Sequence, residues 1–180
     1  MKISIKNAVK IECALALYPR TLTGMNIIFD LNGILFDNEC QQGNMAACAA
    51  LQTINPTQSA HVLRLLNDCI THGNRLFVIS NWTQELYEFM SEVPCVKRIL
   101  EKFDDVILSE AIGFNCSDPR IFNYLIDKHR LDPRQCIVVE NSQLDLHAAG
   151  QVGISRTILC TNLNVTKIRQ ELQFHGALSF

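Results

Sequence analysis

The run NIIFDLNG at residues 26–33 decides the fold, because a short apolar segment leads directly into a carboxylate, an amide and a glycine. Apolar residues without polar alternation predict a strand that is buried on both faces, as in a parallel sheet. Asp30, Asn32 and Gly33 then stand just beyond the carboxyl end of that strand. Ligands of open α/β sheets bind at this edge. The run therefore predicts both a core strand and the beginning of a binding site.

Further strand-like and helix-like segments alternate along the rest of the chain. The other predicted strands are Leu76–Ile79, Val106–Leu108, Ile137–Val139 and, more weakly, Arg156–Cys160. The predicted helices are Gln58–Thr71, Gln84–Leu100 with an interruption around Pro94, Pro119–His129, Gln143–Gln151 and Val165–Phe174. Regular alternation of strands and helices predicts an α/β fold with a doubly wound parallel sheet and right-handed crossovers.

The composition excludes several classes of protein. A chain of 180 residues with 48% hydrophobic and 19% charged residues is not intrinsically disordered, and its length suits one domain. The net charge of −2 offers no basic excess for nucleic acid and no polybasic run for a membrane surface. No apolar run approaches the roughly 20 residues of a spanning helix, and Glu12 interrupts the only candidate signal segment. We therefore expect a cytoplasmic protein without nucleic-acid or membrane partners.

The eight cysteines are scattered along the chain and include no CxxC pair. Several lie in apolar runs, as Cys136 does just before Ile137. We expect reduced thiols that act as small core residues rather than a disulfide framework. A zinc site is not indicated either, because no paired ligands have the usual spacing.

Polar side chains also follow the other predicted strands. Ser80 and Asn81 end the second strand, Glu140 ends the fourth, and Asp145 comes five positions later. Each residue alone could simply cap a helix or lie in a solvated loop, but together they converge on one sheet edge. Such a set suits Mg²⁺, which accepts one or two carboxylates and keeps several waters. A carboxylate at this place can also attack a phosphoryl group.

The strand-end motifs, taken together, resemble those of the haloacid dehalogenase-like (HAD) superfamily. The motifs are IIFDLNGILFD at 27–37, VISN at 78–81, VILSE at 106–110 with DPRIF at 118–122, and IVVENS at 137–142 followed by Asp145. The resemblance covers about residues 25–178. It implies a HAD-like, Rossmann-like fold, and the short span between the first two motifs leaves room for little or no cap.

The resemblance also implies a chemistry, that of a Mg²⁺-dependent phosphatase acting on a small or macromolecular phosphorylated substrate. Asp30 would attack phosphorus and form an aspartyl-phosphate, which water then hydrolyses. Ser80 would bind the phosphoryl oxygens, and Asn81 and Gly33 are further candidates for substrate binding. The implied Mg²⁺ ligands are Asp30, the backbone carbonyl of Asn32, Glu140 and Asp145.

Three positions depart from the family pattern. Asn32 stands where phosphatases of the family have an Asp that acts as general acid and base, and an amide cannot shuttle a proton. Cys116 stands where the family has a Lys, and Arg120 is a conceivable substitute for that positive charge. Asn32 and Cys116 are thus catalytic positions with altered chemistry. In the fourth motif, Glu140-Asn141 replaces the usual acidic pair, and Asp145 could restore the second acid.

Three functional hypotheses follow. The first is a Mg²⁺-dependent phosphatase with reduced or altered activity. The second is a catalytically inactive HAD-like domain, a pseudoenzyme that binds a ligand or partner. The third is a 2-haloacid dehalogenase, which fits the missing acid at Asn32 but not the missing Lys or the short cap.

The domain organisation follows from the position of the first motif. Met25 opens the first core strand, so residues 1–24 are interpreted as an N-terminal extension and 25–180 as the HAD-like domain. Only 50 residues separate Asp30 from Ser80, and the crossover helix occupies the second half of them. A short cap or flap at about 38–55 is all that this span accommodates.

Overall fold

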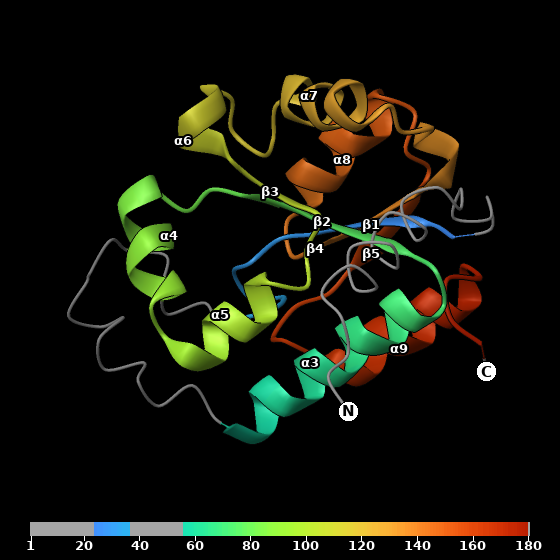
Figure 1. The fold of residues 1–180 in the computed structure, drawn as a ribbon. Coiled ribbons are helices and arrows are strands. Elements are labelled where there is room, and N and C mark those ends of the chain that lie inside the picture. The colour runs from blue at the N-terminus through green and yellow to red at the C-terminus, as the bar shows by residue number, and fades with distance from the viewer. Residues whose placement is uncertain (1–23, 37–55, 180) are drawn as a thin grey trace, which may run out of the picture.

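The computed structural model describes residues 24–36 and 56–179. Within these ranges, five strands form one parallel sheet in the order β3-β2-β1-β4-β5 (Figure 1). The strands are β1 (Asn26–Phe29), β2 (Arg75–Ser80), β3 (Asp105–Leu108), β4 (Cys136–Glu140) and β5 (Arg156–Leu159). The predicted extension before Gly24 and the predicted flap around 38–55 lie outside the described residues.

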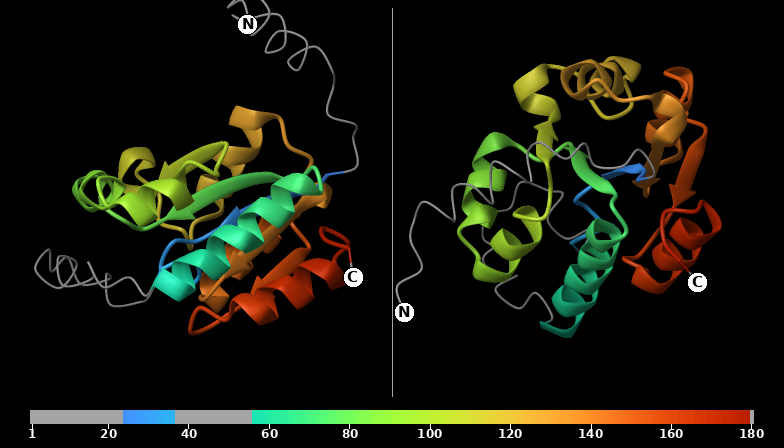
Figure 2. Two further views of the ribbon diagram at one scale, coloured as in Figure 1. Left: turned by 60° about the horizontal axis from the view of Figure 1, so that its bottom comes forward. Right: turned by 45° about the vertical axis from the view of Figure 1, so that its right-hand side comes forward.

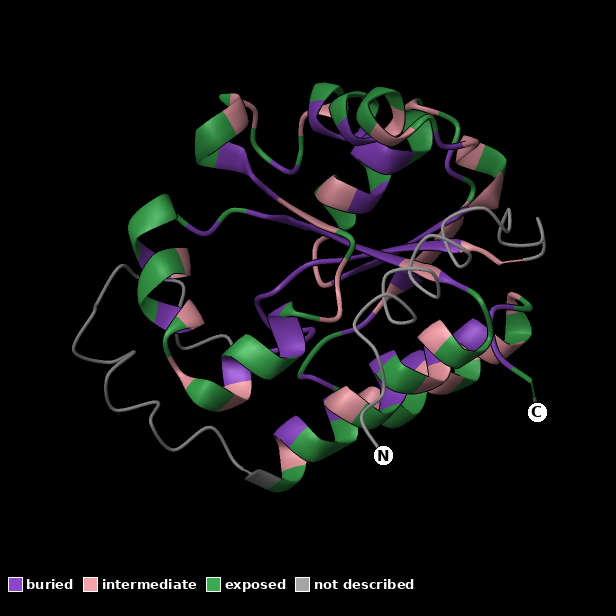
Figure 3. Ribbon diagram, viewed as in Figure 1, coloured by how far each residue is buried: buried purple, intermediate pink, exposed green. Residues whose placement is uncertain are grey.

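Strand β1 is the middle strand, as the buried run at its centre requires. Its residues pair in parallel with β2 on one side and with β4 on the other, so that Phe29 stands between Val78 and Val139. All four residues of β1 are buried, and so are all of β4 and every residue of β2 after Arg75 (Figure 3). The predicted doubly wound α/β fold is confirmed.

Helices cover both faces of the sheet. One face carries α3, α5 and α9, with α3 and α9 side by side, and the other carries α7 and α8 (Figures 1 and 2). The described helices are α3 (Pro56–Thr71), α4 (Gln84–Ser91), α5 (Pro94–Leu100), α6 (Ser109–Ile112), α7 (Pro119–His129), α8 (Gln143–Gln151) and α9 (Val165–Phe174), with a 3₁₀ turn at Pro133–Gln135. Neighbouring residues of β1 belong to different cores, since Ile27 packs on the first face and Ile28 on the second.

Local signals set the helix ends. Asp118 caps α7, because its carboxylate accepts a hydrogen bond from the Arg120 N–H at 2.9 Å and Pro119 occupies the first helical position. Pro94 separates α4 from α5, as predicted, and starts α5 in the position where a missing N–H costs nothing. The described helices include none that is long and apolar enough to cross a membrane.

The cysteines that the structure describes are all free thiols. Four of them are buried and Cys95 is partly buried. Burial raises the pKa of the Cys69 thiol to about 12, so that it stays protonated. These residues behave as the small core residues that the sequence predicts.

Candidate functional site

Three predicted site residues meet at the carboxyl edge of the sheet because their strands are neighbours. Asp30 directly follows β1, Ser80 ends β2 and Glu140 ends β4. Asp30 is 8% exposed, Glu140 2% and Ser80 not at all. The backbone N–H of Asp30 continues the ladder to Val139 at 3.2 Å and fixes where its side chain begins. The predicted juxtaposition of the first and fourth motifs is present.

The carboxyl groups of this site lie in an environment that opposes their charge. Burial raises the pKa of Asp30, and Asp145 raises it further, while a hydrogen bond from Ser80 partly offsets both. Burial also raises the pKa of Glu140, followed by the charges of Asp30 and Asp145. Asp145 is half-buried, and its own pKa is raised by burial. In the described part of the chain, no Lys or Arg is among the groups that shift these pKa values.

Gly33 shapes the loop that follows Asp30. Its φ of +67° lies in the left-handed region that favours glycine. Its N–H donates to the Phe36 carbonyl at 2.6 Å, and its own carbonyl accepts from the Leu163 N–H at 2.9 Å. Both backbone groups of Gly33 are therefore engaged within the fold. This gives Gly33 a turn-forming role, and its contact with substrate remains a prediction.

The side chain of Asn32 is held by a residue that the sequence analysis did not select. Trp82 donates its indole N–H to Asn32 Oδ1 at 2.6 Å, and its ring stacks on Phe36 with centroids 5.5 Å apart. Trp82 is only 1% exposed. Two features of the sequence point to Trp82. It directly follows the second motif, and it is the single tryptophan of the chain.

Asn141, which replaces an acid of the fourth motif, links that motif to the first. Its side-chain amide donates to the backbone carbonyl of Asn32 at 2.8 Å. This is the carbonyl that the resemblance assigns to Mg²⁺. A carbonyl oxygen has two lone pairs, so one remains for a second partner.

Cys116 and Asn81 lie together where the loop before α7 meets the end of β2. The Cys116 N–H donates to Asn81 Oδ1 at 3.2 Å, so Asn81 has a structural role beside its predicted contact with substrate. The Cys116 side chain is 1% exposed. Burial raises the pKa of its thiol, and Asp30 raises it further, so the group stays neutral. Cys116 thus supplies no positive charge to the site.

Arg120 does not replace the missing Lys. Its guanidinium forms an ion pair with Asp118 at 2.6 Å and stacks over the Phe114 ring, 4.1 Å from the centroid. Its side chain is 66% exposed. Arg120 as a replacement for the family's Lys is therefore wrong. Its guanidinium pairs with Asp118, the cap residue of α7, and this pairing holds Arg120 at the surface.

The acidic residues of the site suit a Mg²⁺ ion that takes only a few of its ligands from the protein. Mg²⁺ is bound through one or two carboxylates and otherwise keeps its waters. Asp30 and Glu140 provide two buried carboxylates whose repulsion a divalent cation would relieve. Among the described residues, no three acidic, His or Cys side chains form a ready metal cluster. The ion would thus rest on two carboxylates, with the Asn32 carbonyl and Asp145 as the further predicted ligands.

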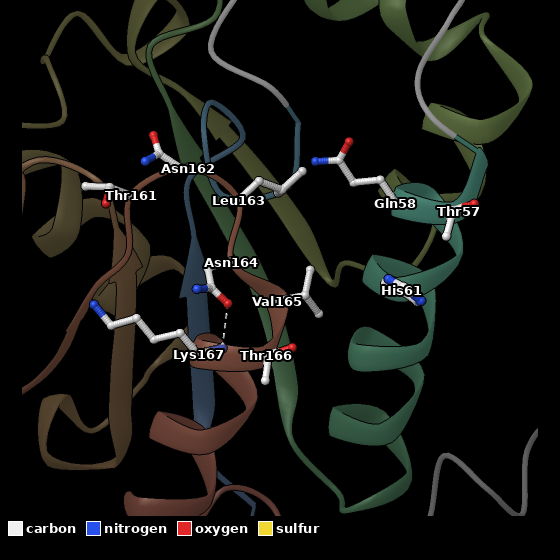
Figure 4. Close-up of a pocket in the computed structure, with 10 residues that line it drawn as sticks. All are labelled: Thr57, Gln58, His61, Thr161, Asn162, Leu163, Asn164, Val165, Thr166 and Lys167. Carbon is white, nitrogen blue, oxygen red and sulfur yellow. Dashed lines mark hydrogen bonds between the residues drawn. The ribbon is translucent and has the colours of Figure 1, made fainter.

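A pocket of about 690 Å³ lies beside the loop that follows β1 (Figure 4). Its walls are the first turns of α3 and α9 and the segment between β5 and α9. Leu163 lines it and also contacts Gly33 through the backbone hydrogen bond described above. The lining side chains are mostly polar and include Lys167 but no acid. The pocket can therefore receive a polar group of a ligand, and the Leu163–Gly33 hydrogen bond joins its wall to the loop that follows β1.

A model of the haloacid dehalogenase-like hydrolase family matches residues 49–159. A search of curated proteins gave no match. Solved structures with similar folds include that of a predicted HAD-like family hydrolase from Porphyromonas gingivalis (16% identity, TM-score 0.65, 84% of this chain and 99% of that chain). A hydrolase from Streptococcus pneumoniae TIGR4 has 18% identity and a TM-score of 0.59, over 84% of this chain and 100% of that one.

A third similar structure is a HAD family enzyme from Bacteroides thetaiotaomicron, solved as an aspartate-to-alanine variant with magnesium and inorganic phosphate. It has 13% identity and a TM-score of 0.55, and the match covers 77% of this chain and 95% of that one. At these identities the three likenesses establish the fold.

Proposed function

The chain belongs to the haloacid dehalogenase-like hydrolase family, and from this premise we propose that it is a Mg²⁺-dependent phosphatase that forms an aspartyl-phosphate on Asp30. The observation that carries the proposal is the pair of buried acids, Asp30 and Glu140, whose pKa values are raised by burial and by neighbouring carboxylates and shifted by no Lys or Arg among the described residues. Such an arrangement destabilises a protein unless a cation is bound.

Each residue has a defined part in the proposed reaction. A carboxylate oxygen of Asp30 bonds to phosphorus, and the ester P–O bond breaks with its electron pair on the leaving oxygen. Ser80 is buried beside Asp30, and its hydroxyl, which donates to Asp30 in the structure, would donate instead to a phosphoryl oxygen. Water then attacks the aspartyl-phosphate and releases inorganic phosphate. Bound Mg²⁺ would supply positive charge for the acids and the phosphoryl oxygens.

An assay with an aryl phosphate tests the proposal. We expect hydrolysis that requires Mg²⁺ and that is lost on chelation, and we expect Asp30→Asn to be inactive because an amide is no nucleophile here. Circular dichroism and melting curves would show that the variant is folded. If the folded wild-type protein hydrolyses nothing with or without Mg²⁺, the phosphatase proposal is wrong.

The second candidate is a catalytically inactive domain that binds a phosphorylated ligand or partner. Two observations favour it, since the Cys116 thiol is neutral and Asn32 carries an amide in place of the general acid. Calorimetry with Mg²⁺ and inorganic phosphate separates the candidates. Binding of both without any turnover of aryl phosphates would select this alternative.

A 2-haloacid dehalogenase is the third candidate, and one of the similar structures is a dehalogenase with an intermediate complex (15% identity, TM-score 0.55, 76% of this chain and 84% of that chain). Such an enzyme would release chloride from 2-chloropropionate. If chloride release occurs and is unaffected by chelation of Mg²⁺, the phosphatase proposal gives way to this one.

A further inference from the structure

Trp82 connects two of the strand-end motifs at the centre of the site. It follows Ser80 and Asn81 after β2, yet its indole N–H bonds to Asn32 and its ring stacks on Phe36, both in the loop after β1. The interplanar angle of 30° and the 1% exposure of Trp82 describe a ring fixed between the two segments. One hydrogen bond and one ring contact therefore join Trp82 to the loop that carries Asn32.

The chemistry of indole settles which end of the Asn32 amide faces it. Indole N–H only donates, so at 2.6 Å it must meet the amide oxygen, Oδ1. The opposite orientation would place two donors against each other. The Asn32 amide therefore turns its NH₂ group away from Trp82, with two N–H bonds to offer.

These N–H bonds remain available to a ligand. Within the described ranges, no hydrogen-bond partner is assigned to Asn32 Nδ2, while the backbone carbonyl of Asn32 accepts from Asn141. Asn32 is 5% exposed, yet among the described buried side chains only the Ser59 hydroxyl is sealed from solvent without a partner. The Asn32 NH₂ group therefore reaches solvent at the acidic edge of the sheet.

We propose that Trp82 is a positioning residue that turns the Asn32 NH₂ group toward the substrate, so that the enzyme acts on phosphate compounds whose leaving group departs as an anion. This inference rests on the proposed phosphatase function. Asp30 would form the new bond to phosphorus, and the leaving oxygen would keep the electron pair of the broken P–O bond. The Asn32 N–H would donate a hydrogen bond to that oxygen but transfer no proton.

The substrate class follows from this step. A leaving oxygen that receives no proton must be stable as an anion, so its conjugate acid should have a pKa no higher than that of a phenol, about 10. Aryl, enol and acyl phosphates meet this condition. Alkyl phosphates, such as sugar phosphates esterified at an alcohol, do not.

Kinetics on a series of leaving groups tests the substrate class. We expect wild-type kcat/KM to fall about tenfold for each unit by which the leaving-group pKa rises, and alkyl phosphates to be inert. Equal rates for alkyl and aryl phosphates would overturn the inference.

Two variants separate the hydrogen bond of Trp82 from its packing. Trp82→Phe keeps an aromatic ring beside Phe36 but removes the N–H, and Phe36→Leu removes the stacking but keeps the N–H. We expect Trp82→Phe to lower kcat about tenfold with little change in KM, because the amide loses its fixed orientation. Phe36→Leu should lower the melting temperature but leave kcat within about twofold. Equal effects of both variants on kcat would overturn the positioning role.

A measurement without turnover distinguishes this inference from the proposed function. The single tryptophan gives one indole N–H cross-peak in a nitrogen-15 NMR spectrum. Inorganic phosphate, titrated in the presence of Mg²⁺, should shift that peak through the Asn32 amide, and Asn32→Leu should make its proton exchange faster with solvent. A shift by phosphate without hydrolysis of any ester would refute the phosphatase but support the orientation. A peak insensitive to phosphate and to Asn32→Leu would refute the positioning role even in an active enzyme.

Discussion

Acidic residues lie at both the amino and the carboxyl edge of the sheet, and their surroundings shift their pKa values in opposite directions. At the amino edge, Asp105 begins β3 and accepts from Lys128 Nζ and from His129 Nε2, each at 2.7 Å. Burial alone would raise the pKa of Asp105, but the hydrogen bonds from these two residues outweigh it and lower the pKa. At the carboxyl edge, burial raises the pKa values of Asp30 and Glu140. The charge of Asp145 raises both further, and the charge of Asp30 also raises that of Glu140.

The difference distinguishes an acid that is neutralised within its own chain from the two acids that we propose to be functional. The charge of Asp105 is already neutralised by its own chain, so it holds α7 against β3 and has nothing left to bind. The neighbouring strands β1 and β4 fix the positions of Asp30 and Glu140, and no Lys or Arg of the described residues is among the groups that shift their pKa values. Under the proposed function, such a site would lower the stability of the metal-free protein and would favour an incoming cation.

The sharpest test of this contrast exchanges one acid at each edge for its amide. Asp30→Asn should reduce hydrolysis of an aryl phosphate by at least about 10³-fold, while its melting temperature stays the same or rises because one buried repulsion is removed. Asp105→Asn should leave hydrolysis unchanged and lower the melting temperature by about 2–4 °C. The contrast would collapse if both variants lost stability to the same extent.

The pH dependence of stability should also differ between the edges. The pKa values of Asp30 and Glu140 are raised from 3.8 and 4.5 to about 7 and about 9, so the folded chain keeps protons that the unfolded chain has released. Stability is therefore largest below the ordinary pKa values and decreases as the pH rises through the folded ones. Without Mg²⁺, we expect the melting temperature to fall by several degrees between about pH 6 and pH 9.

Two controls accompany this pH series. Excess Mg²⁺ should flatten the curve, since a bound cation favours the ionised acids. Asp105→Asn should keep the same slope, because the lowered pKa of Asp105 affects stability only at acidic pH. A melting temperature of the metal-free wild type that is constant over the range would contradict the raised pKa values.

A lysine introduced at the carboxyl edge should neutralise the acids there, as Lys128 neutralises Asp105 at the amino edge. Cys116→Lys places an ammonium group among Asp30, Glu140 and Asp145, all of which act electrostatically on Cys116. We expect about tenfold higher turnover of an aryl phosphate, because the charge stabilises the attacked phosphoryl group. Cys116→Met adds bulk without charge and is the matched control. Equal activity of the two variants would show that charge is not what the site lacks.

The smallest expected effect is that of restoring an acid beside Asp30. Asn32→Asp places a carboxyl group against the indole N–H of Trp82, and that hydrogen bond favours the ionised form over the proton donor. Turnover of poor leaving groups should therefore rise by less than about tenfold. Adding Trp82→Phe should raise it further. A large rescue by Asn32→Asp alone would show that Trp82 does not control this position.

Segments with strong local signals were predictable from the sequence. The helices at Pro119–His129, Gln143–Gln151 and Val165–Phe174 have the predicted bounds, since their caps and apolar stripes are local. The meeting of Asp30 and Glu140 followed from the rule that parallel strands end at one edge. The short helix α6 and the 3₁₀ turn were missed, because three or four residues carry too little periodicity.

The contacts within the site were not predictable in the same way. Trp82 lies 50 positions from Asn32, and Asn141 lies 109 positions from it. No pattern in the sequence relates side chains at such separations, because only the packed sheet brings them together. For the same reason Arg120 was misjudged, since its pairing with Asp118 depends on how α7 begins.

The central place of β1 also affects how the chain is made. During synthesis β1 emerges early, but its neighbour β4 starts only at Cys136, more than a hundred positions later. Until then the apolar edge of β1 has no partner, and open edges of this kind pair with other chains. A ribosome that stops before β4 would therefore release a fragment prone to aggregation and devoid of the acidic site. Messages truncated before the codon for Cys136 should therefore yield inclusion bodies rather than soluble protein.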